Sequence, residues 1–324
     1  MKRILTGIFF FLLSAAGSAA AEPVRLVLQW QHQSQFAGYY MALEKGFYRA
    51  ENLDVTLIPG GAHVDPLRMI RDGQADFCTT MLSSVLGRHD RNEFVLLQQV
   101  LNRSNLTLVA WKKGRHGIDS IAAPSDLDQR RITLWDGFRP PYEAFFRRYG
   151  IDPVIIPQYY SFSLFLHRGA DACCAMRYNE YHSLIQHGLR DEELTVFDFH
   201  ELGVDLPEDG LFAVAETWRR RLSVCDAFVR ASMKGWQYAR DHRRETLDVV
   251  MRYVEEARLP ANRPHMEWML DTILQAVFPA TDAGWIPGQL TEERYRKAVS
   301  ILGLEGSEPA YGDFVTPGAQ RGLH

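Results

Sequence analysis

The sequence predicts a two-lobed α/β fold with parallel-rich sheets that are flanked by helices and joined by two hinge crossings. The stretch from Leu26 to Gly60 has the pattern of a strand, a helix and a second strand, which is the unit of a parallel sheet with a right-handed crossover. A second alternating set of strands and helices runs from Arg131 to Phe199. The chain is expected to pass between the lobes twice. It passes once in a glycine-containing segment before this second set and once in a turn-forming segment after it.

The N-terminus has the pattern of a secretory signal. A basic start precedes a short apolar run, and small residues then end in an Ala-x-Ala pattern before Glu22. The apolar run is too short for a membrane span, although an N-terminal anchor helix is the alternative. No cysteine precedes Cys78, so we expect a cleaved signal peptide over residues 1–21, no lipoprotein attachment and a periplasmic mature chain.

The composition argues against nucleic acid as a partner. The formal net charge is −4 and becomes −6 without residues 1–21, which hold two basic residues and no acidic one. Disulfides are possible in an exported chain, but their connectivity cannot be read from the sequence. We favour four buried thiols, at Cys78, Cys173, Cys174 and Cys225.

The first lobe is expected to be discontinuous, with residues 22–112 and 213–324 on either side of a second lobe, 113–212. In this interpretation the strands 93–101 and 106–111 complete the first sheet, and the basic connector 112–117 leads to the second lobe. Helices with apolar residues at i, i+3 and i+4 are expected to pack on the first lobe, at 227–240, 245–257, 266–278 and 292–302. The tail after Gly306 is expected to be loosely draped.

Four segments should meet where the lobes face each other, because ligands of open parallel sheets bind at the carboxyl ends of the strands. Candidate residues with aromatic faces for stacking on a flat molecule are Trp30, Phe36, Tyr39, Trp135 and Tyr178. Candidate hydrogen-bonding residues are Gln33, Gln35, Ser83, Ser84, Asp136, Asn179 and Glu180. Acidic groups and few bases at these positions disfavour an anionic ligand and favour a molecule rich in N–H donors.

Several of these residues have a structural alternative. Phe36 begins an apolar stripe with Tyr40 and Phe47, which is typical of the core-facing side of one helix. The two serines can simply cap a helix, Asp136 precedes a glycine in a turn pattern, and Glu180 can start a helix.

The stretch around Trp30 resembles a known family. Trp30, Ala37, Gly38 and Tyr40 are followed by ALEKGFYRAENLDV, by GQADF at 73–77 and by RYNEYH at 177–182. This ordered set is similar to the periplasmic solute-binding proteins related to binders of thiamine pyrimidine precursors, the SsuA/THI5-like family of ABC transporters. The resemblance covers roughly residues 24–305 and implies the fold of a type II periplasmic binding protein.

The resemblance further implies a monomer that captures a small heterocyclic, pyrimidine-like ligand and delivers it to an ABC permease in the inner membrane. Glu180 matches the Asn-Glu region that the family uses in its second lobe. The loop 31–36 departs from the pattern of the thiamine-precursor binders, with Phe36 where they carry His, so the ligand's identity stays open. Kinase-fused relatives imply an alternative, a periplasmic sensor that docks on a membrane sensor kinase.

The same superfamily includes pyrimidine synthases that use iron, a histidine and a cysteine-rich motif. Here the segment DACCAMR offers only Cys173 and Cys174, inside a strand that is expected to be buried. No serine, cysteine or histidine spacing nominates a nucleophile and its base. We therefore expect no catalysis, no cofactor and no metal site.

Overall fold

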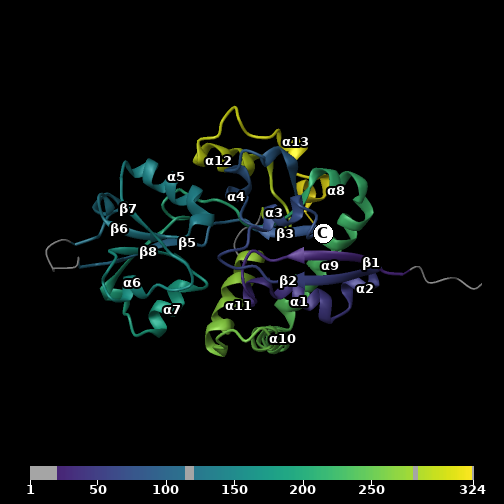
Figure 1. Ribbon diagram of the computed structural model, residues 1–324, viewed down its shortest axis with the longest axis horizontal. Coiled ribbons are helices and arrows are strands. Elements are labelled where there is room, and N and C mark those ends of the chain that lie inside the picture. The colour runs from purple at the N-terminus through teal and green to yellow at the C-terminus, as the bar shows by residue number, and fades with distance from the viewer. Residues whose placement is uncertain (1–19, 114–119, 280–283, 323–324) are drawn as a thin grey trace, which may run out of the picture.

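The computed structural model describes residues 20–113, 120–279 and 284–322 and contains two five-stranded sheets, one in each lobe (Figure 1). The first sheet has the order β2 (Leu53–Ile58), β1 (Glu22–Val27), β3 (Phe77–Thr80), β10 (Glu208–Val214) and β4 (Phe94–Leu101). The second has the order β7 (Val154–Pro157), β6 (Arg131–Leu134), β8 (Ala172–Met176), β5 (Leu106–Trp111) and β9 (Leu194–Asp198). This is the two-lobed α/β architecture that the sequence predicts.

Helices flank both sheets. Those of the first lobe are α1 (Ala37–Glu44), α2 (Phe47–Ala50), α3 (Pro66–Arg71), α4 (Leu82–Leu86), α8 (Ala215–Arg220), α9 (Leu222–Asp241), α10 (Arg243–Glu256), α11 (Arg263–Val277), α12 (Glu292–Leu302), α13 (Tyr311–Phe314) and α14 (Pro317–Arg321). Those of the second lobe are α5 (Arg139–Tyr149), α6 (Ser163–Leu166) and α7 (Glu180–Gln186). Figure 1 shows α10 and α11 on one side of the first lobe and α12 and α13 on the opposite side.

Each sheet combines a parallel core with one returning strand. Strand β1 pairs in parallel with β2 and β3, and β6 pairs in parallel with β7 and β8. Strand β10 runs antiparallel between β3 and β4, while β5 runs antiparallel between β8 and β9. The carboxyl ends of β1, β3, β6 and β8 therefore lie on the edges of the sheets where a ligand is expected.

The returning strands correct one expectation about the crossings. Strand β5 belongs to the second sheet, so the expectation that residues 106–111 complete the first sheet is wrong. Likewise, the turn-forming segment that is expected to make the second crossing contains the whole of β10, a strand inside the first sheet. The chain crosses between sheets at 102–105 and 199–207, and we place the lobe boundaries there rather than at residues 112 and 213. Residues 114–119 of the expected connector lie outside the described residues.

Two further expectations are corrected by the packing. The apolar stripe from Phe36 to Phe47 is divided between a turn of 3₁₀ helix and two helices, and Gly46, in a left-handed conformation with φ 70°, separates the two helices. The tail after Gly306 is not loosely draped: its two short helices pack on β4, and Phe314 and Val315 are almost completely buried. The burial of these two side chains fixes the tail on the first lobe, which its Gly- and Pro-containing sequence does not indicate.

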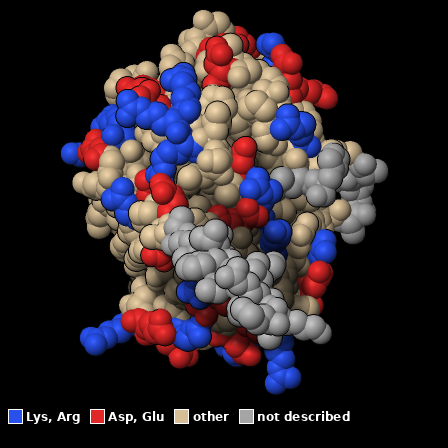
Figure 2. All heavy atoms as spheres, turned by 90° about the vertical axis from the view of Figure 1, so that its right-hand side faces the viewer, with Lys and Arg blue, Asp and Glu red and all other residues tan. Residues whose placement is uncertain are grey.

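All four cysteines are free thiols in buried positions, as the sequence favoured. Cys173 and Cys174 lie in β8, at the centre of the second sheet. Most of the predicted signal peptide, residues 1–19, lies outside the described residues. Within the part that is described, none of the helices combines the length and the apolar character needed to cross a membrane. Figure 2 shows basic and acidic side chains interspersed on one face of the molecule.

Two glycines allow α1 and α9 to pack in close contact. A Cβ atom at Gly235 would lie 2.0 Å from the carbonyl oxygen of Gly38 and 2.7 Å from the backbone nitrogen of Ala42. A Cβ atom at Gly38 would lie 2.2 Å from the indole ring of Trp236. Helix α1 directly follows the loop after β1, so the close packing of α1 on α9 helps to position the end of that loop.

We predict that Gly235→Ala lowers the free energy of unfolding by about 1–3 kcal/mol, the usual effect of overpacking, because backbone atoms of α1 cannot give way as a flexible side chain would. Urea denaturation of the two proteins measures the difference. Gly312→Ala is the control, since a Cβ atom there meets nothing within 4 Å. An equal effect of both substitutions would contradict the packing argument.

Candidate functional site

The cavity of interest lies where the carboxyl ends of strands from both sheets meet. Strand β1 is followed by residues 28–36, β6 by 135–138 and β8 by 177–180. Between these segments lies a narrow cavity of about 30 Å³, lined by Gln29, Trp30, Gln33, Gln35, Trp135, Phe138, Met176, Tyr178, Asn179 and Glu180. The topology thus brings together segments that are as much as 150 residues apart in the chain.

Most of the residues predicted for the site line this cavity: Trp30, Gln33, Gln35, Trp135, Tyr178, Asn179 and Glu180. Ser84 and Asp136 lie instead in an adjoining groove of about 640 Å³, which shares Trp30 and Trp135 with the cavity. The hydroxyl of Ser84 donates a hydrogen bond to the carbonyl oxygen of Gly137, over 3.3 Å. Ser84 therefore connects the lobes at the mouth of the cavity.

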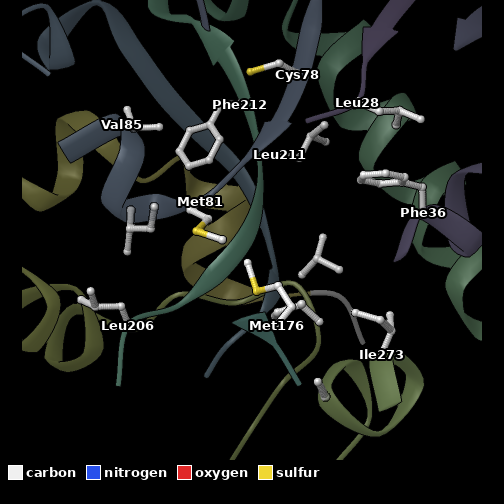
Figure 3. Packing of buried hydrophobic residues seen from close by; sticks show 14 of the residues in the cluster. Leu28, Phe36, Cys78, Met81, Val85, Met176, Leu206, Leu211, Phe212 and Ile273 are labelled. Carbon is white, nitrogen blue, oxygen red and sulfur yellow. The ribbon is translucent and has the colours of Figure 1, made fainter. Parts of the chain in front are cut away.

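Three predicted residues face the core instead of a cavity. Phe36 is 1% exposed and packs in the hydrophobic core of the first lobe, where Figure 3 shows it near Leu28. The ring of Tyr39 meets Trp236 edge-on, with the ring centroids 5.9 Å apart. Ser83 is buried within α4. Because these side chains follow the helical period rather than the strand ends, the structural alternative describes them better than a ligand contact.

Sequence reasoning missed four residues that shape the cavity. Gln29, Phe138 and Met176 line it directly. Asp209 lies behind the lining and accepts hydrogen bonds from the side-chain amides of Gln29 and Gln35. Gln29, Phe138 and Met176 lie at or just after the ends of elements that the sequence located correctly. Extending each predicted site segment by one or two residues would have included them. The only local pattern at Asp209 is an Asp before a Gly, which is typical of a turn.

Contacts across the groove hold the lobes together. The indole of Trp30 and the ring of Tyr160 lie with their centroids 5.4 Å apart. The hydroxyl of Tyr160 accepts a hydrogen bond from the backbone N–H of Ala62, over 2.9 Å. Within the second lobe, Trp135 is held in place by a hydrogen bond from its indole N–H to the carbonyl oxygen of Tyr159, over 3.1 Å. Together these contacts show a closed arrangement in which aromatic rings from both lobes surround the cavity.

Glu180 is the carboxyl group that faces the cavity from the second lobe. It accepts hydrogen bonds from the backbone N–H of Met176 over 3.0 Å and from the side-chain amide of Asn179 over 2.8 Å. Removal from water raises the pKa of Glu180 to about 7 despite these bonds. Neutral and ionised forms are therefore both available near pH 7, and either can accept a hydrogen bond from a ligand.

The cavity lining holds no lysine or arginine. Arg88 lines the adjoining groove, but its guanidinium is paired with Asp65 over 3.0 Å and with Asp90 over 2.7 Å. Among the described residues, no group of three or more His, Cys, Asp or Glu side chains is placed to hold a metal ion. The chemistry of the cavity is that of aromatic surfaces and hydrogen-bond acceptors.

A comparison with protein-family models finds a match to NMT1/THI5 like over residues 33–246, which is more than half of the chain. The protein belongs to the NMT1/THI5-like family. The resemblance inferred from the residues around Trp30 is thereby confirmed at the level of the family. A search of curated protein sequences finds no match to this chain.

Solved structures that share the fold have low sequence identity to this member of the family. A protein from Bordetella bronchiseptica RB50 is 14% identical, with a TM-score of 0.70, and the match covers 92% of this chain and 96% of that one. The periplasmic aliphatic sulphonate binding protein SsuA from Escherichia coli is 13% identical, with a TM-score of 0.62 and coverage of 87% and 86%. The desulfurization enzyme DSZB is 12% identical, with a TM-score of 0.58 and coverage of 91% and 96%. These likenesses establish the periplasmic binding protein fold of type II.

A pair of histidines joins the lobes beside the cavity. His182 on α7 and His265 on α11 have their Nδ1 atoms 2.9 Å apart, and Trp268 stacks on the His182 ring. His265 Nε2 lies 2.8 Å from Asn179 Oδ1. Because Asn179 donates its amide to Glu180, its oxygen must accept, and so His265 Nε2 carries a proton. His265 Nδ1 is therefore the acceptor for the Nδ1–H of His182.

In this arrangement His265 is neutral, because its Nδ1 accepts from His182; a second proton on His265 would require the neutral His182 ring to change tautomer so that its own Nδ1 becomes the acceptor. Burial, together with the charge of His182, lowers the pKa of His265 to about 4 in the closed form. An exposed histidine in an open form has a pKa near 6.5. The lower pKa in the closed form means that closure is favoured above about pH 6.5 and is weakened as the pH falls toward 4.

We predict that the equilibrium constant for closure falls roughly 30-fold between pH 7.5 and pH 5 through His265 alone, the effect of shifting a pKa of 6.5 to 4. Small-angle X-ray scattering follows closure as a decrease in the radius of gyration. His265→Gln keeps an amide that can bond Asn179 but removes the titration, and should reduce the pH dependence. His167→Gln is the matched control: His167 is exposed at the C-terminal end of α6, and this variant should retain the pH dependence. Glu180, whose pKa burial raises to about 7, titrates in the same range with the opposite sign, so the test is the difference between the variant and the unmodified protein. An identical pH dependence in the two proteins would contradict the assignment.

Proposed function

We propose that the protein is a monomeric extracytoplasmic solute-binding protein that captures a small heterocycle between its lobes and delivers it to an ABC permease. The observation that carries this proposal is the cavity together with the adjoining groove, which are both lined by two tryptophans, Trp30 from one lobe and Trp135 from the other, and by polar side chains of both lobes. A molecule in this position touches both lobes only when they are closed. Binding therefore favours the closed state, which is the form that a partner protein can distinguish.

The lining favours a flat ligand that donates hydrogen bonds. Indole and phenol rings supply apolar faces, and the carboxyl group of Glu180 accepts from N–H groups, with charge-assisted bonds about twice as strong as neutral ones. A pyrimidine-like thiamine precursor fits this description. A sulphonate, which the similar Escherichia coli protein binds according to its name, would meet acceptors and no lysine or arginine in this cavity.

The buried environment of the cysteines supports a binding role over catalysis. Cys173 and Cys174 are fully buried, and removal from water raises the pKa of both thiols far above the usual range. They are poor nucleophiles and poor metal ligands in this state. The likeness to the desulfurization enzyme is a likeness of fold, and fold alone does not carry an activity.

We predict that 2,4-diaminopyrimidine raises the melting temperature of residues 22–324 by several degrees. A ligand at 100 times its dissociation constant adds about 2.7 kcal/mol to the free energy of unfolding. Trp30→Ala and Glu180→Gln should each reduce the shift, because they remove a stacking face and a charged acceptor. Glu216→Gln is the control, since Glu216 forms an exposed ion pair with Arg220. Stabilisation by methanesulfonate and none by the pyrimidine would contradict the proposed ligand class.

Delivery to a permease and signalling through a membrane sensor kinase both use a closed binding protein. Uptake of the ligand distinguishes them: deletion of the gene abolishes uptake if the protein serves a transporter. Unchanged uptake with a lost transcriptional response to the ligand would favour the sensor kinase as the partner.

A further inference from the structure

Three glutamine side chains form a chain of amides that ends on Asp209. The amide nitrogen of Gln33 donates to the carbonyl oxygen of Gln35 over 2.5 Å. The amide nitrogen of Gln35 donates in turn to the carboxylate of Asp209, over 2.8 Å to Oδ2 and 3.1 Å to Oδ1. The amide nitrogen of Gln29 donates to Oδ1 of the same carboxylate. All three glutamines line the cavity, while Asp209 lies behind them and is 5% exposed.

The backbone holds Asp209 in an unusual conformation. Its φ of 50° is in the left-handed region that residues other than glycine rarely adopt. Asp209 lies near the start of β10, whose pairing with β4 shifts register two residues later, between Leu211 and Phe212. Such conformations cluster at functional sites, where the surrounding structure enforces them. Here the surrounding hydrogen bonds place the carboxylate against the two amides.

An ionised carboxylate can only accept hydrogen bonds, and this fixes the direction of every amide in the chain. Each –NH₂ group points toward Asp209, so the free ends of the chain are carbonyl oxygens. One of these ends is Oε1 of Gln29, a buried acceptor that has no hydrogen-bond partner among the described residues. The other is Oε1 of Gln33, whose amide nitrogen is already used. A buried acceptor without a partner is uncommon in native proteins and calls for a donor.

We propose that Asp209 is a positioning residue that orients the glutamine oxygens toward the cavity and thereby restricts the ligand to molecules that present N–H donors on this side. This rests on the proposed function and adds which atoms select the ligand. With Glu180 on the opposite lobe, the cavity presents acceptors from both sides. Aminopyrimidines and amidine-like cations meet this requirement, whereas ring compounds that present only acceptors, and anions, do not.

Two probes with the same ring test the proposal: 2,4-diaminopyrimidine, which presents donors, and 2,4-dimethoxypyrimidine, which presents only acceptors. Calorimetry should show that the protein prefers the diamino compound. In Asp209→Asn the new amide also donates, so at least one glutamine turns its –NH₂ group toward the cavity. We expect the preference to fall about tenfold or more, the effect of one buried hydrogen bond lost and one acceptor mismatched.

Two further variants make the binding experiment decisive. Glu216→Gln removes an exposed carboxylate that pairs with Arg220 in the ion pair described above, does not touch the amide chain, and should leave the preference unchanged. Gln29→Met removes the unpartnered oxygen and leaves Asp209 in place, so it should weaken the diamino probe selectively even if Asp209→Asn does not fold. An equal loss of both probes in these variants, or an unchanged preference in Asp209→Asn, would overturn the proposal.

A measurement without ligand separates this proposal from the proposed function. In protein labelled with ¹⁵N at glutamine, the side-chain –NH₂ signals of Gln29 and Gln35 should be shifted and protected from solvent exchange. Both features should be lost in Asp209→Asn and kept in Glu216→Gln. If neither pyrimidine binds the unmodified protein, the heterocycle proposal fails, while these signals still decide the role of Asp209. Signals that do not respond to Asp209→Asn would overturn that role.

Discussion

The start of strand β10 is the point on which both the hinge and the cavity depend, because it carries two adjacent buried carboxyl groups with different tasks. Glu208 accepts hydrogen bonds from the backbone N–H groups of Asn105 and Leu106, in and just after the first crossing between the lobes, and from the hydroxyl of Ser104. Asp209, one residue later, accepts from the glutamine amides of the cavity lining. Burial, with the charge of Asp209, raises the pKa of Glu208 to about 8, and burial raises that of Asp209 to about 6. Two buried carboxyl groups can lie side by side here because each accepts hydrogen bonds from several N–H or O–H donors.

This arrangement explains how a small molecule could control a movement of whole lobes. The returning strand lies between β3 and β4 of the first sheet, so the carboxyl groups at its start are held by a rigid element. The cavity also touches the second lobe through Tyr178, Asn179 and Glu180. Asn179 belongs to a continuous set of hydrogen bonds that leads from Glu180 to His265 and His182. The ligand site and the histidine contact between the lobes therefore share one polar network.

Much of the site follows from local sequence patterns, and the remainder depends on distant pairing. Trp30, Trp135 and Glu180 were predictable because each follows a strand, and strand ends of a parallel sheet gather at one edge. Asp209 was not, because its Asp-Gly pattern is that of a turn, and only the antiparallel pairing with β3 and β4 places it beside Gln29. The same holds for His182 and His265, which are separated by 83 residues and show no local signal. Phe36 and Tyr39 were predicted as ligand contacts from the loop pattern. Their helical spacing was the better guide, because both side chains are buried in the core.

The central claim is that the lobes close on a small donor-bearing molecule, and a distance between the lobes tests it most directly. Spin labels at Val154 on the second lobe and Leu222 on the first, both about half exposed, allow this distance to be measured by pulsed electron resonance. We expect a broad distribution in the free protein and a single short distance with 2,4-diaminopyrimidine, but not with methanesulfonate. A distance distribution that does not change when the pyrimidine is added, or that narrows only with methanesulfonate, would contradict the account.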